Sequence, residues 1–179
     1  MRSEVRVAGF GGQGIGLAGY ILGKALALYD GREAVMTQSY GPEARGGASS
    51  ANIVISDREI AYPFVQHPDV LVAMSQEAYA KYYPTVKDDG LILIDNDLVT
   101  PEDVKEHHSI PATQLAEECG RRIVANMVML GFFCAVTDLV GWKALEEAIA
   151  STVKPKTKAL NLKAFATGRE YGVRELSRS

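Results

Sequence analysis

The stretch Gly9-Phe10-Gly11-Gly12-Gln13-Gly14-Ile15-Gly16 decides the fold, because it separates a short apolar run from a segment with a helical pattern. The run before it, Val5-Arg6-Val7-Ala8, predicts a strand. The segment from Ile15 to Tyr29, rich in Leu, Ala and Ile, predicts a largely buried helix. In such a strand–turn–helix unit the backbone amides at the helix start can face an anion. The G-x-G-x-x-G spacing is a weak signal when alone, since the glycines can also serve only to pack the helix closely on the strand.

The next strand argues against an ordinary dinucleotide site. NAD-binding folds of the usual type place an Asp or Glu about 20 residues after the glycines, at the end of the second strand, to hold the ribose. Here the second predicted strand is Ala34-Val35-Met36-Thr37-Gln38, and Gln38 occupies that place. The glycine turn is therefore expected to bind phosphate-like anions or a partner's carboxylate, without tight NAD binding.

Composition indicates an ordinary globular chain of 179 residues, most simply a single domain over residues 1–179. No apolar run reaches the length of a membrane span, and the chain enters a strand at once, so no signal peptide is predicted and a cytoplasmic location is expected. Cys119 and Cys134 form no C-x-x-C pair, which disfavours an iron–sulfur cluster or structural zinc held by this chain alone. The excess of basic residues after Trp142 is not dense or aromatic enough for a nucleic-acid surface. It is interpreted as a solvated helix face, with a contact to a partner or a polyphosphate as the alternative.

The middle of the chain predicts a mixed sheet. Residues 48–56 and 59–63 are extended segments joined by a short turn, which predicts an inserted antiparallel hairpin. Residues 69–75 and 91–95 are apolar enough to be parallel strands buried on both faces, and 107–112 predicts an edge strand. The expected fold is a three-layer α/β/α architecture with a mixed, mostly parallel sheet and a Rossmann-like start.

Helices are predicted over much of the remainder. Residues 76–83 and 114–118 form short helices, the second with Thr113 as its N-cap and Gly120 as its end. The apolar segment Ile123 to Val140 predicts a helix that is deeply buried or faces a partner, in which Asn126 more often satisfies a backbone group than binds a ligand. Two amphipathic helices separated by Pro155 close the chain.

The loop after the second strand is a second candidate site. It reads Ser39-Tyr40-Gly41-Pro42-Glu43-Ala44-Arg45-Gly46-Gly47. Its glycines leave room for another surface, and the Arg45 guanidinium could bind a carboxylate or phosphate. An Arg45 that pairs with Glu43 or with a local carbonyl is an equally good interpretation of the local sequence.

These motifs together make the chain resemble the gamma subunit of the 2-oxoacid:ferredoxin (acceptor) oxidoreductases, most closely the 2-oxoglutarate type. The resemblance rests on stretches that keep their order over nearly the whole chain: residues 9–14, 38–47 and 68–77, Asn126-Met127, and Asn161-Leu162-Lys163-Ala164-Phe165.

The resemblance implies an enzyme complex that oxidatively decarboxylates a 2-oxoacid to acyl-CoA and reduces ferredoxin. Thiamine diphosphate with magnesium and the iron–sulfur clusters would belong to the alpha, beta and ferredoxin-like partner subunits. This chain would then be a non-catalytic subunit, inactive when isolated, that binds no cofactor alone. The resemblance also implies that coenzyme A binds near this subunit. The candidate contact residues are Gly9, Gly11, Gly12, Gln13, Gly14, Gln38, Ser39, Tyr40, Arg45, Gly46 and Gly47.

Two other classes of function stay open on the residues alone. The glycine turn would suit a free-standing NAD(P)- or flavin-dependent enzyme, although Gln38 and the lack of an acid–base pair oppose that. It would also suit a stand-alone nucleotide- or dinucleotide-binding module without catalysis. Neighbouring genes for thiamine-binding and ferredoxin-like subunits would favour the oxidoreductase subunit over both.

Overall fold

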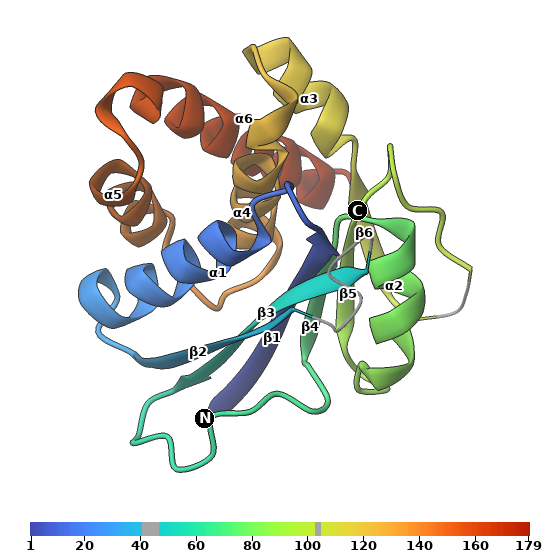
Figure 1. Ribbon diagram of the computed structural model, residues 1–179, viewed down its shortest axis with the longest axis vertical. Helices are drawn as coiled ribbons and strands as arrows, with labels where there is room; N and C mark the ends of the chain where they lie inside the picture. The colour runs from blue at the N-terminus through green and yellow to red at the C-terminus, as the bar shows by residue number, and fades with distance from the viewer. Residues whose placement is uncertain (41–46, 103–104) are drawn as a thin grey trace.

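The computed structural model describes residues 1–40, 47–102 and 105–179 and contains one six-stranded sheet in the order β2-β3-β1-β4-β5-β6 (Figure 1). Only β3 runs against the others: it pairs antiparallel with β2 and β1, whereas β1, β4, β5 and β6 pair in parallel. The mixed, mostly parallel sheet predicted from the sequence is confirmed. The strands are β1 (Arg2–Phe10), β2 (Glu33–Tyr40), β3 (Ala48–Ser56), β4 (Val70–Ala73), β5 (Leu91–Asp95) and β6 (His107–Ile110).

The predicted hairpin between residues 48–56 and 59–63 is wrong in its pairing. Residues 59–63 form no strand, and β3 instead lies between β2 and β1, with Asn52 opposite both Thr37 and Arg6. A two-residue turn was a good local signal for a hairpin. Instead of this hairpin, β3 pairs with the long strands β1 and β2 and is buried in the middle of the sheet.

The helices form two layers of unequal size. Helix α2 (Gln76–Tyr82) packs on β1 and β4 from one side, whereas α1 (Ile15–Lys24), with a π-helical turn at Ala25–Tyr29, lies on the opposite side together with the larger group (Figure 1). That group is completed by α3 (Ala112–Cys119), α4 (Ala125–Val136), α5 (Trp142–Thr152) and α6 (Lys158–Ser177). Each layer has its own apolar cluster against the sheet, so the predicted three-layer architecture is observed.

Helices α4 and α6 pack closely against each other because glycine residues lie at their contact. A Cβ atom at Gly131 would overlap the backbone oxygen of Phe165, and one at Gly168 would overlap the backbone oxygen of Val128. The two backbones therefore meet without side chains between them, and Phe132 and Phe165 fill the space beside the crossing. The prediction that this apolar segment is deeply buried is confirmed, although helix α4 spans a shorter stretch than the apolar run.

Thr113 is not the N-cap of α3. The helix begins at Ala112, and Thr113 donates its hydroxyl to the buried carboxylate of Asp95 at 2.6 Å. Asp95 also accepts the backbone N–H groups of Ala112 and Asp97, both at 3.1 Å, which join the end of β5 to the start of α3. Burial raises the pKa of the Asp95 carboxyl, and the bonds from Thr113 and Asp97 oppose that rise. The end of α3 at Gly120, with a φ of 137°, follows the prediction.

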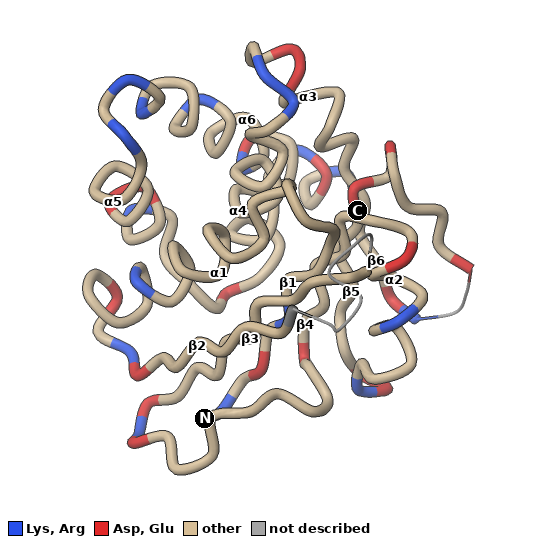
Figure 2. The backbone as a smooth tube through the Cα atoms, viewed as in Figure 1, with Lys and Arg blue, Asp and Glu red and all other residues tan. Residues whose placement is uncertain are grey.

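The charges of the C-terminal region are spread over a solvated surface. Figure 2 shows lysines and arginines around the turn that joins α5 and α6, interspersed with acidic residues along both helices. No described helix combines the length and the apolar character needed to cross a bilayer.

Candidate functional site

The glycine turn has the geometry that its sequence requires. Gly12 and Gly14 have φ values of 93° and 71°, in the left-handed region that favours glycine. Gly14 is also the N-cap of α1, and its carbonyl oxygen accepts a bond from Asn126 Nδ2 at 3.1 Å. A Cβ atom at Gly14 would overlap that amide, so this position excludes side chains for two independent reasons. Asn126 thus satisfies a backbone group, as the sequence predicts.

Gln13 has a structural task. Its Oε1 accepts the N–H of Phe10 at 2.9 Å, and its Nε2 donates to the carbonyl oxygen of Met74 at 2.8 Å. The side chain therefore ties the end of β1 to the end of β4, and a Cβ atom at Gly9 would overlap it. Both amide atoms of Gln13 have a protein partner, so what this turn offers to a ligand is its backbone.

The start of α1 is open to an anion. No described side chain caps it, and its first turn has no acidic residue. Nothing described lies within 4 Å of a Cβ atom built at Gly11. Open N–H groups at the positive end of a helix dipole favour a negatively charged group there. The turn can therefore receive a phosphate or carboxylate.

The second candidate loop begins and ends beside the glycine turn. In the strand register Ser49 lies between Tyr40 and Gly9, and its hydroxyl donates to the Gly9 carbonyl oxygen at 3.3 Å. Gln38 reaches the first turn of α1, since a Cβ atom at Gly16 would lie 3.1 Å from its Nε2. The structure thus brings together two segments that are more than 20 residues apart in sequence.

The remaining residues of that loop divide into two groups. Ser39 points to the opposite face of the sheet from Gln38, as alternation along a strand requires, and Gly47 lies just before β3. Arg45 and Gly46, with residues 41–44, lie outside the described residues.

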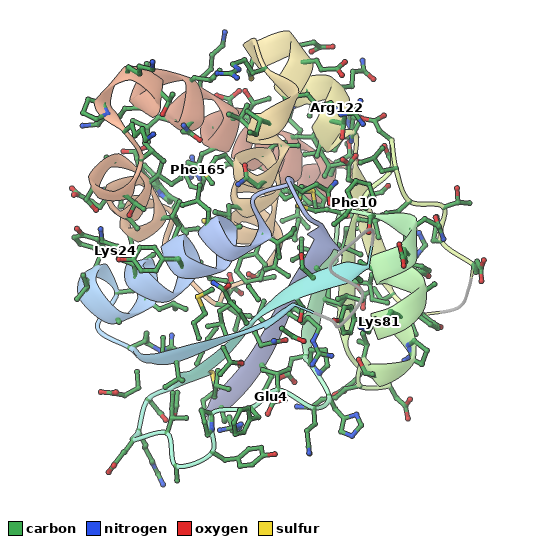
Figure 3. The ribbon with its side chains drawn as sticks, in the orientation of Figure 1. Glu4, Phe10, Lys24, Lys81, Arg122 and Phe165 are labelled. Carbon is green, nitrogen blue, oxygen red and sulfur yellow. The ribbon has the colours of Figure 1, made fainter. Side chains whose placement is uncertain are left out.

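Two hollows flank the glycine turn and bring in residues that the sequence analysis missed. One, of about 400 Å³, is lined by Phe10, Gly11, Gly12 and Arg122. The other, of about 480 Å³, is lined by Gly14, Leu17, Arg121, Lys154 and others. In Figure 3 the labelled residues Phe10 and Arg122 lie toward the same end of the molecule.

The two hollows share a chemical character. Ile123 lines both and is 58% exposed, beside the exposed side chains of Phe10 and Leu17. Among the described residues Arg122 forms one ion pair, a long and exposed one of 3.9 Å with Glu117, so its charge is available to a ligand. The surface therefore combines open amides, cations and apolar groups, which suits a ligand with both phosphate and apolar parts. The short basic segment 121–122, directly before a buried helix, was the signal in the sequence.

The described residues offer no metal centre. No group of three or more His, Cys, Asp or Glu side chains among them is arranged to hold a metal ion. Cys119 and Cys134 are free thiols in different surroundings, and burial raises the pKa of Cys134 to about 11. The side chains that the structure describes are therefore not arranged as ligands for an iron–sulfur cluster or for a magnesium-bound cofactor.

The strand order of the sheet is a second argument against a dinucleotide site of the usual kind. Because β3 separates β2 from β1, the end of β2 is two strands away from the strand that carries the glycines. In the usual dinucleotide fold these two strands are neighbours. This topology, together with Gln38, disfavours a ribose contact of the usual kind.

Comparison with known proteins defines the class. Residues 4–171 match the family described as pyruvate ferredoxin/flavodoxin oxidoreductase. The chain is 52% identical over 179 residues to the 2-oxoglutarate synthase subunit KorC of Methanothermobacter marburgensis, covering 95% of this chain and 96% of that one. The chain therefore belongs to the pyruvate ferredoxin/flavodoxin oxidoreductase family.

Solved structures narrow the class to one kind of subunit. The gamma subunit of a keto/oxoacid ferredoxin oxidoreductase from Geobacter sulfurreducens is similar with a TM-score of 0.88 and 41% identity, covering 97% of this chain and 98% of that one. The 2-oxoglutarate:ferredoxin oxidoreductase of Magnetococcus marinus, solved with 2-oxoglutarate, coenzyme A and succinyl-CoA bound, is similar with a TM-score of 0.85 and 25% identity, over 99% of this chain and 32% of that one. The chain is a gamma-type subunit of a multi-subunit oxidoreductase, which confirms the predicted resemblance.

Proposed function

We propose that this chain is the non-catalytic gamma subunit of a 2-oxoglutarate:ferredoxin oxidoreductase and that its glycine turn binds the phosphate-bearing part of coenzyme A. The open start of α1, flanked by Arg121, Arg122 and Lys154, is the observation that carries the second part. The substrate follows from the KorC relatives, which are named as 2-oxoglutarate synthase subunits. Residues 1–179 are taken as one gamma-type domain.

Within the complex this chain would bind and orient, while its partners carry the redox chemistry. Thiamine diphosphate, magnesium and iron–sulfur clusters would lie on the alpha, beta and ferredoxin-like subunits, with ferredoxin as acceptor in the cytoplasm. When bound, coenzyme A supplies the thiol that accepts the acyl group. The amides of Gly12 and of the start of α1 would hold its phosphates, whereas the Gln13 N–H already donates to the Phe10 carbonyl oxygen. The exposed apolar groups of Phe10, Leu17 and Ile123 would contact its less polar part. Arg45, Gly46 and Gly47 remain candidates for a further contact with coenzyme A or a partner.

The coenzyme A assignment is tested by Gly11→Val. The new side chain enters open space and Gly11 does not have a positive φ, so the melting temperature of the chain should stay unchanged. In the reassembled complex the bulk should obstruct the approach of phosphate. We expect the KM for coenzyme A to rise about tenfold, equivalent to about 1.4 kcal/mol.

The KM for 2-oxoglutarate measured in the same assays is the internal control, because its binding should not involve this turn. An unchanged KM for coenzyme A in an assembled, stable Gly11→Val complex would assign the turn a purely structural role.

A further inference from the structure

A second polar region lies on the opposite face of the sheet from α1. Where α2 covers that face the strands present apolar residues such as Leu71 and Ile92. Beyond α2 the strand register places Thr37, Asn52 and Arg6 side by side, with Ser39 opposite Ser50 in the neighbouring row. A central strand region with so many polar side chains needs an explanation, because buried polar groups are costly unless they are partnered.

Arg6 is the centre of this cluster and is only 8% exposed. Its Nε donates to Asn52 Oδ1 at 2.7 Å, its Nη1 to Thr85 Oγ1 at 3.1 Å and its Nη2 to the Val65 carbonyl oxygen at 2.7 Å. All three acceptors are neutral, and the guanidinium lies 4.7 Å from the centre of the Tyr82 ring.

The charge of Arg6 lacks a direct counter-ion among the residues that the structure describes. None of the ion pairs there involves it. Glu4 contributes at a distance, but its carboxylate is paired with Arg2 at 2.9 Å. Burial lowers the pKa of the Arg6 guanidinium, yet an arginine stays charged inside a protein. A buried cation without a direct acidic partner is unusual, since such charges are normally paired.

The cluster forms the floor of a cavity of about 330 Å³, which is walled by Phe64, Val65 and Tyr82. The floor is rich in donors. Three of the five guanidinium N–H groups are used in the bonds above, and the Ser50 hydroxyl accepts from Asn52 Nδ2, which leaves its own hydrogen to donate. A small cavity with a cation and further donors, and with no acid among its described lining residues, is complementary to a carboxylate.

We propose that the Arg6 cavity binds a carboxylate, carried either by a small organic acid or by an acidic side chain of a neighbouring subunit. The site lies on the other face of the sheet from the start of α1, and it does not depend on the coenzyme A assignment. The carboxylate supplies the counter-ion that the described residues do not provide.

The variant Asn52→Asp tests this directly, because it places a carboxylate at the Asn52 oxygen that already lies 2.7 Å from Arg6 Nε. The new side chain is isosteric, and the Ser50 hydroxyl can turn to donate to it, so the fold should be kept. The internal carboxylate should then exclude an external one and weaken its binding at least tenfold. Asn96→Asp is the matched control, since it adds the same charge at an exposed residue. Phe64→Glu is a second test that does not depend on a buried change, because Phe64 is 55% exposed at the cavity wall.

Two measurements distinguish the two sources of the carboxylate. Calorimetric titration of the isolated chain with succinate, against sodium chloride of equal ionic strength, detects a small organic acid. Titration of the chain against its partner subunits detects an acidic side chain. Saturable succinate binding that is lost in Asn52→Asp and Phe64→Glu but kept in Asn96→Asp supports the first source. Tenfold weaker assembly of the same two variants, without succinate binding, supports the second. If wild-type chain binds no succinate and both variants assemble like Asn96→Asp, the proposal is overturned.

Discussion

Gly131→Val is expected to lose at least about 3 kcal/mol of unfolding free energy, the upper end of what overpacking a core costs. The reason is that the new side chain would meet the backbone of α6, where a Cβ atom already overlaps the Phe165 carbonyl oxygen. Backbone cannot rotate away as a flexible side chain can, so the two helices must separate. For a chain of this length the melting temperature should fall by roughly 6–12 °C, measured by circular dichroism.

Gly23→Ala is the matched control for that substitution. Gly23 lies in α1, and a Cβ atom there has only an ordinary contact of 4.0 Å with Met36. Alanine at a helical glycine without strain should stabilise the chain by about 0.4–1 kcal/mol. If Gly131→Val melted like Gly23→Ala, the close crossing of α4 and α6 would be refuted.

Gly14→Val should be the most damaging change in the glycine turn. Its φ of 71° is costly for a β-branched residue, and its Cβ would displace Asn126, which donates to the Gly14 carbonyl oxygen. Strain and the lost hydrogen bond together should lower the unfolding free energy by about 2–4 kcal/mol. Urea denaturation of the isolated chain measures this effect without partners.

Gly11→Val is the natural comparison, since it changes the same turn without a strained backbone conformation and without a lost hydrogen bond. Stability should fall only in Gly14→Val, whereas the KM for coenzyme A should rise in Gly11→Val, whose fold is intact. Equal stability of the two variants would show that the left-handed geometry at Gly14 does not constrain the turn.

Much of the fold could be predicted because its local signals agree with its tertiary packing. Apolar periodicity and the positions of glycine residues predicted the glycine turn, the parallel strands β4 and β5 and the long buried helix. The position of β3 could not be found, because a local turn at residues 57–58 signals a hairpin while the real partners lie far away in sequence. Thr113 was misassigned for a similar reason, since its partner Asp95 is 18 residues away.

The candidate site was predicted in part. The sequence indicated the two loops, and the strand register explains why the ends of both meet at Ser49. The basic pair Arg121-Arg122 is visible in the sequence, but its position at the turn is not. That position, like the position of Lys154 between α5 and α6, comes from tertiary packing. The buried charge of Arg6 was also hidden, since one arginine in an apolar strand has no distinct pattern.

The central claim, that this chain serves a 2-oxoglutarate-oxidising complex without catalysing the reaction itself, is tested most directly by reassembly. The measurement is ferredoxin reduction that depends on 2-oxoglutarate and coenzyme A, assayed for the chain alone, for its partner subunits alone and for the reassembled complex. We expect a colourless, inactive isolated chain and full activity only when all subunits are present. Decarboxylation of 2-oxoglutarate by the isolated chain, or full activity of the partners without it, would contradict the account.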